Sequence, residues 1–193
     1  CIRILDVYYS MGKVANRTLL SLWKGKVIVV NKYFIYPIAY LCFKFLNDSH
    51  KCELICGDKD IMHLLDKHPV SLTLPEDMLI KGDYNLCQQL KIPSGAKIVC
   101  LNIRDSAYYG VNSLDNSVTS YRNTIELVNF IEAIKYLINK GFYVIRMGRD
   151  VEKKFPLKDD MFIDYANSNF SSDFMDIFLA NKCEFFISTL TGW

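Results

Sequence analysis

Residues 97–103, KIVCLNI, are apolar at every position except Lys97 and Asn102 and predict a buried β-strand. Two similar runs follow in the chain, FYVIR at residues 142–146 and EFFIS at residues 184–188. Continuous apolar runs of this length are typical of parallel strands whose two faces are both covered by helices. The three runs therefore predict a parallel sheet in this part of the chain.

A helix is predicted between the first two of these strands. Asn123 and Glu126 have the spacing of a capping box, and Gly141 stands where such a helix would end. The apolar residues between them recur at three- and four-residue intervals: Leu127, Phe130, Ile131, Ile134, Leu137 and Ile138. A strand, a helix and a second strand in this order predict a βαβ crossover.

A second unit of the same kind follows. A short strand is predicted over residues 161–164, and a helix over residues 173–181 with Ser171 or Ser172 as its N-cap. Asp173 and Asp176 would then lie near the positive end of that helix. Alternating strands and helices predict a doubly wound, Rossmann-like α/β domain.

The domain boundaries follow from changes along the sequence. Residues 1–70 alternate short apolar runs with polar joints, for example KVIVV at 26–30, and predict a first α/β part. Residues 71–96 contain Pro75, Pro93 and two glycines without a long period, and predict a linker. Residues 97–193 form the predicted Rossmann-like domain. Because the chain starts with Cys and stops just after a strand-like run, we expect a piece of a longer protein with this domain incomplete.

Composition narrows the class of protein. Hydrophobic residues make up 51% of the chain, and 23 basic against 21 acidic side chains give a net charge of +2. These values exclude disorder and make nucleic acid an improbable partner, because phosphate binding needs clustered Lys and Arg. The longest apolar run, residues 33–43, contains Pro37 and is too short to span a bilayer. Peripheral membrane contact through this run stays open beside the favoured reading, burial in the core.

The seven cysteines lie mostly inside apolar runs, which indicates reduced thiols in a cytosolic protein. Cys52 and Cys56 with three scattered histidines do not form a zinc-ligand pattern. The triplet at residues 58–60, DKD, could hold a divalent ion but is more typical of a solvated turn. No dinucleotide fingerprint, Walker loop or nucleophile elbow occurs, so dehydrogenases, P-loop NTPases and α/β-hydrolases are excluded.

Ligands of open parallel sheets bind beyond the carboxyl ends of the strands, and each predicted strand delivers polar residues there. Arginine suits a diphosphate because its planar guanidinium donates two parallel hydrogen bonds. Arg104 could instead pair with Asp105 or Asp164 at the sheet edge. The candidate residues at this edge are Arg104, Asp105, Arg146, Gly148, Asp164, Tyr165, Ser188, Thr189, Thr191 and Gly192.

Six segments of the second half of the chain form a recognisable set: NIRDSAYY (102–109), SYRN (120–123), VIRMG (144–148), IDYA (163–166), SDFMDIFL (172–179) and FFISTLTG (185–192). With these segments, residues 97–192 resemble a family of bacterial glycosyltransferases associated with surface-polysaccharide gene sets. More distantly, they are similar to the nucleotide-binding half of GT-B fucosyltransferases, although Asn102 stands where that pattern commonly has a histidine.

The resemblance implies a GT-B-like fold with two Rossmann-like domains, the second cut short. Arg104 would neutralise the donor diphosphate, Arg146 would be a second phosphate or sugar contact, and residues 188–192 would supply hydroxyl and backbone donors. Asp105 and Asp164 would serve as base or as sugar and ribose ligands. The cofactor-binding set would be completed by Gly148 and Tyr165.

The function expected on this basis is transfer of a sugar from a nucleotide-diphosphate sugar to a glycan or lipid-linked acceptor, in surface-polysaccharide synthesis. The nucleotide sugar is the donor substrate, and neither a cofactor nor a metal is expected. The expected location is the cytoplasm, with peripheral membrane contact left open. A sugar-nucleotide epimerase of the same fold and a non-catalytic module that binds a sugar nucleotide or a protein partner remain alternatives.

Overall fold

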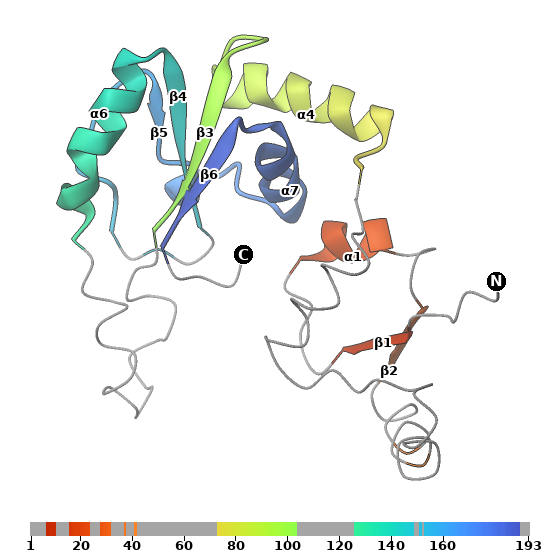
Figure 1. Cartoon of the computed structure of the whole chain (residues 1–193). Helices are drawn as coiled ribbons and strands as arrows, with labels where there is room; N and C mark the ends of the chain where they lie inside the picture. Colours follow the sequence, from red (N-terminus) through yellow and green to blue (C-terminus); the bar gives the residue numbers. More distant parts are fainter. Residues whose placement is uncertain are drawn as a thin grey trace, which may run out of the picture. The chain divides into compact units, whose positions relative to one another are not determined.

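The chain divides between residues 73 and 74 into unit 1, Cys1–Thr73, and unit 2, Leu74–Trp193. The structure is a computed structural model (Figure 1). It describes residues 7–10, 16–23, 28–31, 37, 41, 73–103, 126–148, 151 and 153–189.

Unit 1 contains a parallel pair of strands, β1 (Val7–Ser10) and β2 (Ile28–Asn31), separated in the chain by helix α1 (Arg17–Trp23). The side chain of Asn16 begins α1, since its Oδ1 accepts a hydrogen bond of 2.8 Å from the backbone N–H of Leu19. β2 overlaps the strand predicted over residues 26–30. The described part of unit 1 is thus a small βαβ arrangement.

Unit 2 contains a four-stranded sheet in the order β5-β4-β3-β6, with every neighbouring pair parallel. This confirms the α/β class and the parallel sheet predicted from the apolar runs, and it is compatible with a Rossmann-like domain. The strands match the predicted ones to within two residues at each end: β3 (Lys97–Asn102), β4 (Phe142–Met147), β5 (Phe162–Ile163) and β6 (Phe185–Ser188).

The crossover helix between β3 and β4 is α6 (Ile131–Asn139), preceded by a 3₁₀ turn, η3 (Leu127–Phe130). Gly141 ends it as predicted: its φ is +83°, a conformation that suits glycine, and its N–H bonds to the carbonyl of Ile138 at 2.8 Å. Asn123, the predicted cap, lies outside the described residues. The βαβ crossover is confirmed.

The connection from β5 to β6 runs through a second 3₁₀ turn, η4 (Tyr165–Asn167), and helix α7 (Asp173–Lys182). Ser172 caps α7, since its Oγ accepts a hydrogen bond of 3.3 Å from the N–H of Met175. Asp173 and Asp176 lie in the first turn, where acidic side chains favour a helix start. The helix predicted over residues 173–181 is therefore confirmed.

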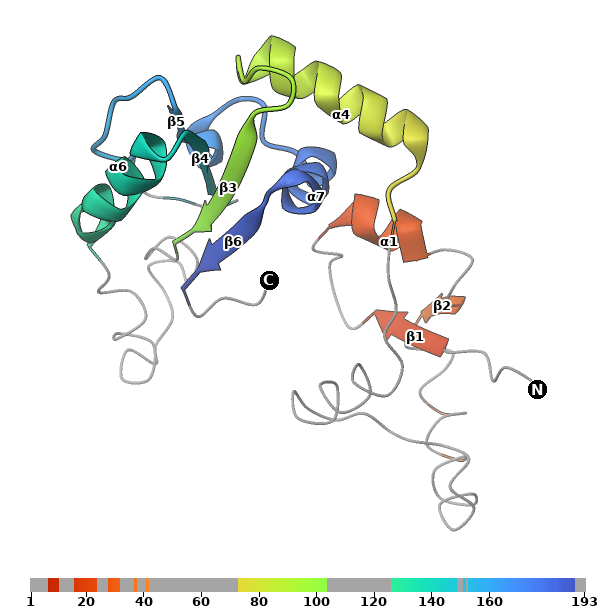
Figure 2. The ribbon, with the colours of Figure 1, turned by 45° about the horizontal axis from the view of Figure 1, so that its top comes forward.

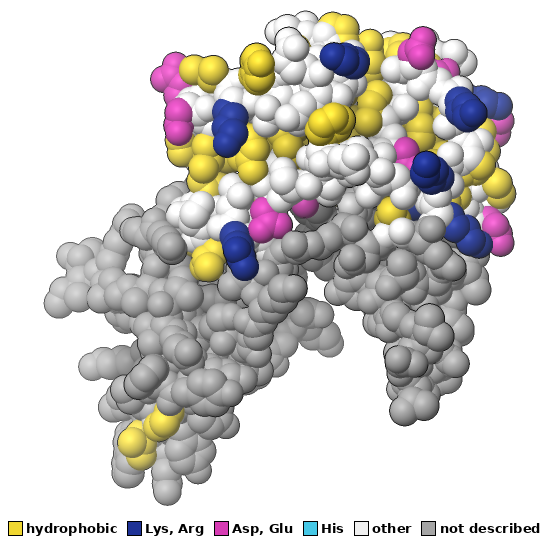
Figure 3. Space-filling view, turned by 180° about the vertical axis from the view of Figure 1, so that it is seen from behind, with side chains coloured by type: hydrophobic (Ala, Val, Ile, Leu, Met, Phe, Trp, Pro, Cys, Tyr) yellow, Lys and Arg dark blue, Asp and Glu magenta, His cyan; other side chains and the backbone are white. Residues whose placement is uncertain are grey.

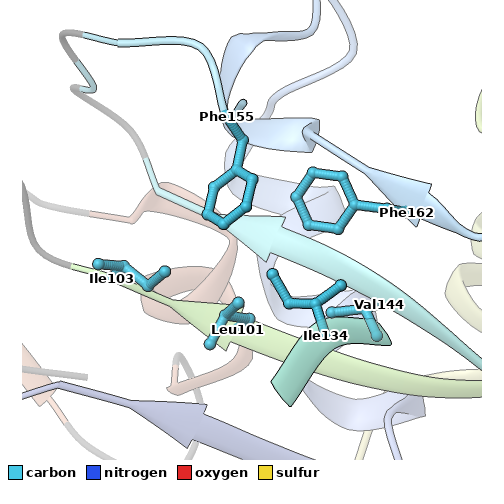
Figure 4. Packing of buried hydrophobic residues seen from close by; sticks show 6 residues of the cluster. All are labelled: Leu101, Ile103, Ile134, Val144, Phe155 and Phe162. Atoms are coloured by element: carbon cyan, nitrogen blue, oxygen red, sulfur yellow. The ribbon is translucent and has the colours of Figure 1, made fainter. Parts of the chain in front are cut away.

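Helices cover both faces of the sheet. α6 lies on one face, and α7 with α4 (Glu76–Gln89) lies on the other (Figure 1, Figure 2). Figure 4 shows the core under α6, where the rings of Phe155 and Phe162 lie 4.8 Å apart. That cluster consists of Leu101, Ile103, Ile134, Val144, Phe155 and Phe162. The opposite core is built from residues including Leu86, Met175, Phe178 and Leu179.

The prediction of a linker over residues 71–96 is wrong, because helix α4 occupies most of this stretch and packs on α7. Gly82 lies against the ring of Phe178, and Leu86 is fully buried. Lys182 at the end of α7 forms an ion pair with Asp83 at 2.9 Å. Pro75 precedes the first residue of the helix, where a missing N–H costs nothing. Prolines that we took as marks of a loop flank a packed helix.

Candidate functional site

The strand order places a topological switch point between β3 and β6. From β3 the chain passes to β4 and then β5 on one side, and α7 carries it back to β6 on the other side of β3. Asn102 of β3 is in register with Met147 of β4 and with Ser188 of β6. The carboxyl ends of these three strands therefore meet at one edge. In open α/β sheets, ligands bind outside this edge at the switch point.

Three residues at the β3–β6 end are described. Asn102 is buried with 5% of its surface exposed, and its carbonyl accepts a hydrogen bond of 3.0 Å from the N–H of Thr189. The exposed Ser188 donates from its Oγ to the carbonyl of Thr189 at 2.7 Å. The hydrogen bond from Thr189 to Asn102 extends the pairing of β6 with β3 beyond the last residue of β6. It fixes where the polar turn begins.

Four of the predicted site residues lie outside the described residues: Arg104, Asp105, Thr191 and Gly192. The segments that contain them start at neighbouring points, because Ile103 and Thr189 follow the paired residues Asn102 and Ser188. The described structure thus brings together the starting points of the two segments that we expected to hold a diphosphate.

Arg146 and Asp164 form an ion pair at the ends of β4 and β5. The Nη1 of Arg146 lies 3.3 Å from Oδ1 of Asp164, with side-chain exposures of 0% and 21%. The same Nη1 donates to the carbonyl of Lys153 at 2.8 Å, and the guanidinium lies 5.7 Å from the ring centroid of Phe155. A buried guanidinium held in this way is part of the interior of unit 2.

The second carboxylate oxygen of Asp164 is also engaged. Its Oδ2 accepts hydrogen bonds from the N–H of Phe155 at 2.9 Å and from Nδ2 of Asn167 at 2.7 Å. The carboxylate therefore joins β4, the segment around Phe155 and the turn η4. Both oxygens of this partly exposed carboxylate thus accept hydrogen bonds from the protein.

This arrangement bears on two expected roles. Arg146 was expected to contact phosphate or sugar, and Asp164 to act as base or ligand, but the structure pairs them with each other. Arg146 is fully buried within the described part of unit 2. Arg146 lies inside β4, in register with Leu101, and Asp164 directly follows β5. The pairing weighed for Arg104 is made by Arg146.

Tyr165 and Gly148, two further predicted site residues, lie just after β5 and β4. Tyr165 is fully buried, accepts a hydrogen bond of 2.9 Å from the N–H of Ser172 and donates to Asp176 at 2.8 Å. Burial raises the pKa of its phenol. Gly148 has φ +146°, where a side chain is strained, and a Cβ there would lie 3.1 Å from Val151. Through these two hydrogen bonds, Tyr165 braces the start of α7.

Charge on unit 2 is mixed. On the face that Figure 3 shows, Lys and Arg side chains are scattered, and Asp and Glu side chains lie among them. Within the described ranges, no group of three or more His, Cys, Asp or Glu residues is placed to hold a metal ion. Among the helices of the described part of the chain, none is long and apolar enough to cross a membrane.

Comparison with known proteins gives no relative. No family model matches the chain, and neither the curated proteins nor the solved structures contain a significant match. The chain's own residues and geometry are therefore what indicate its function.

Proposed function

We propose that this chain belongs to a GT-B glycosyltransferase that moves a sugar from a nucleotide-diphosphate sugar to a hydroxyl of a glycan or lipid-linked acceptor. The observation that carries the proposal is the strand order β5-β4-β3-β6, with Asn102 and Ser188 as register partners at the switch point. In the sequence, Arg104 comes two residues after Asn102, and Thr189 follows Ser188. A guanidinium and hydroxyl groups thus belong to the two segments that leave the ligand-binding edge.

The chemistry of this combination suits departure of a nucleoside diphosphate. As the bond to the anomeric carbon breaks, negative charge gathers on the diphosphate. Donors placed in advance then bind the transition state more tightly than the ground state. Arg104 supplies the positive charge that neutralises the diphosphate, in place of a metal ion. The turn that begins at Ser188 supplies hydroxyl and backbone donors. Asp105, one residue after Arg104, is the carboxylate that we assign as base toward the acceptor hydroxyl.

The other strand-end residues take supporting roles in this proposal. Arg146 and Asp164 fix the ends of β4 and β5 through their ion pair, and Tyr165 fixes the start of α7. A rigid edge of this kind holds ligand-binding segments in one geometry, so that less ordering is needed when the donor binds. The proposal therefore separates the binding residues, next to β3 and β6, from the residues that brace the edge.

We expect one nucleoside diphosphate among GDP, UDP, CDP and ADP to stabilise the chain against heat, and Arg104→Ala to lose that stabilisation. At a hundred times the dissociation constant, a ligand adds about 2.7 kcal/mol to the free energy of unfolding. The measurement is a thermal melt with each nucleotide over a concentration series. Lys135→Ala is the matched control, because Lys135 is an exposed cation on α6 that pairs with Glu132 at 3.0 Å.

Equal stabilisation of wild type and Arg104→Ala would remove Arg104 from the site, and no stabilisation by any nucleotide would contradict the proposal. Product analysis then separates the enzyme classes. A glycosyltransferase yields a glycosylated acceptor and a nucleoside diphosphate from the donor. An epimerase yields a free or epimerised sugar without any acceptor, and a binding module leaves the donor intact.

A further inference from the structure

Cys100 and Cys183 come together at the end of α7, although 83 positions separate them in the sequence. Cys100 lies in β3 and is fully buried, and its Sγ donates to the carbonyl of Leu179 at 3.5 Å. The N–H of Cys183 donates to that same carbonyl at 3.0 Å. Cys183 follows the last residue of α7 and is half-buried, with its Sγ 3.3 Å from the carbonyl of Ala180. A single carbonyl thus gathers both cysteines at the junction of α7 and β6.

The two thiols differ in acidity because of this contact. A side-chain hydrogen bond with Cys100 lowers the pKa of Cys183 to about 7, against the opposing effects of burial and of Glu184. The same contact, with burial, raises the pKa of Cys100. A thiolate is the nucleophilic form of cysteine, so near neutral pH Cys183 is the reactive partner. It is also the more accessible of the two.

We propose that Cys100 and Cys183 form a redox-active pair that closes to a disulfide bond between β3 and the α7–β6 junction. The oxidant is a small disulfide such as oxidised glutathione. The Cys183 thiolate attacks one of its sulfurs, a bond forms between Cys183 and one glutathionyl group, and the other leaves as a thiolate. Cys100 then loses its proton, attacks the sulfur of Cys183 and displaces the second glutathionyl thiolate. The protein loses two hydrogens, and the oxidant is reduced to two thiols.

The position of the pair gives the disulfide a structural consequence. Glu184, next to Cys183, donates its N–H to the carbonyl of Ile98 at 2.8 Å, which begins the pairing of β6 with β3. The other end of that pairing is the edge at Asn102 and Ser188. A covalent link would therefore fasten the strand that bears the polar turn. This inference rests on the cysteines alone and is independent of the proposed glycosyl transfer.

The test is to expose the reduced, folded full chain to oxidised glutathione, block remaining thiols by alkylation and digest with trypsin. Trypsin cuts after Lys97, Arg104 and Lys182, and no Lys or Arg follows Lys182. The expected product is a single cross-linked species of peptides 98–104 and 183–193, lighter than their sum by two hydrogens and released by reduction. Addition of a reducing thiol should return the original peptides.

Three variants make the result specific. Cys87→Ser removes a half-buried cysteine of α4 and should leave the cross-link unchanged. Cys100→Ala should trap a glutathione adduct on Cys183, since the second attack cannot occur, whereas Cys183→Ser should leave Cys100 unmodified. A wild-type chain that keeps glutathione on Cys183 without the cross-link, or that does not react at Cys183, would overturn the proposal. A cross-link to another cysteine at equal yield would overturn it as well.

Discussion

Asp164→Ala should lower the free energy of unfolding of unit 2 by about 3–5 kcal/mol, as removal of one partner from a buried ion pair typically does. Arg146 has no exposed surface, and the Asp164 carboxylate helps to offset its charge at 3.3 Å. The substitution also removes the acceptor for the N–H of Phe155 and for Asn167. A loss of this size is a large part of the stability of an ordinary domain.

Urea unfolding followed by circular dichroism measures the effect, and hydrogen exchange of the β4 amides assigns it to unit 2. The matched control is Glu132→Ala, which breaks the exposed pair with Lys135 and should change the free energy by about 0–1 kcal/mol. A double variant, Arg146→Met with Asp164→Ala, should lose less than these two single changes added together. If Asp164→Ala instead unfolded like wild type and lost only nucleotide binding, the carboxylate would belong to the ligand site.

The sheet of unit 2 could be predicted because its signals are local. Residues 97–102 and 142–147 carry continuous apolar runs, and the helix between them shows a regular three- and four-residue period ended by Gly141. Ser172, one of the two serines predicted as the cap of α7, is its cap in the structure. Such patterns report on a few consecutive residues, and they fix the type of each element before its neighbours are known.

Helix α4 was not predicted because the contacts that stabilise it are not local in the sequence. Its buried side is narrow, since Ile80 and Tyr84 are each 65% exposed while Leu86 is buried against α7. A glycine inside the helix lowers its propensity, and prolines before and after it suggested a loop. What holds the helix is packing on α7, a segment almost a hundred residues further along the chain. Tertiary contact outweighs propensity here.

The candidate site likewise has features that local sequence patterns predict and features that depend on tertiary contacts. The sequence predicted Asp164 just after a strand, as the structure has it, but it could not show that Asp164 pairs with Arg146, because that pairing depends on the order of the strands. Nor could it bring Cys100 to Cys183, whose meeting depends on where α7 ends against β3. The sequence shows which chemical groups are present. Whether such a group contacts a ligand or another part of the protein depends on the fold.

Phe178→Ala should cost about 3–5 kcal/mol, the usual loss for a fully buried aromatic side chain, and should loosen α4 from α7. The ring of Phe178 lies directly under Gly82, and a Cβ added at Gly82 would overlap it. Alanine at position 82 therefore has two opposing effects in the wild-type chain. Better helix propensity contributes about 1 kcal/mol, and the overlap costs about 1–3 kcal/mol.

The sign of Gly82→Ala is expected to depend on Phe178 for this reason. In the wild-type chain the substitution should destabilise unit 2, whereas in a Phe178→Ala background it should stabilise it, because only the gain in helix propensity remains. Urea unfolding of the four proteins gives the coupling energy, and Gln88→Ala, at an exposed position of α4, controls for alanine in this helix. An equal effect of Gly82→Ala in both backgrounds would mean that α4 does not pack on Phe178. The helix would then be a tether between the units, as its prolines first suggested.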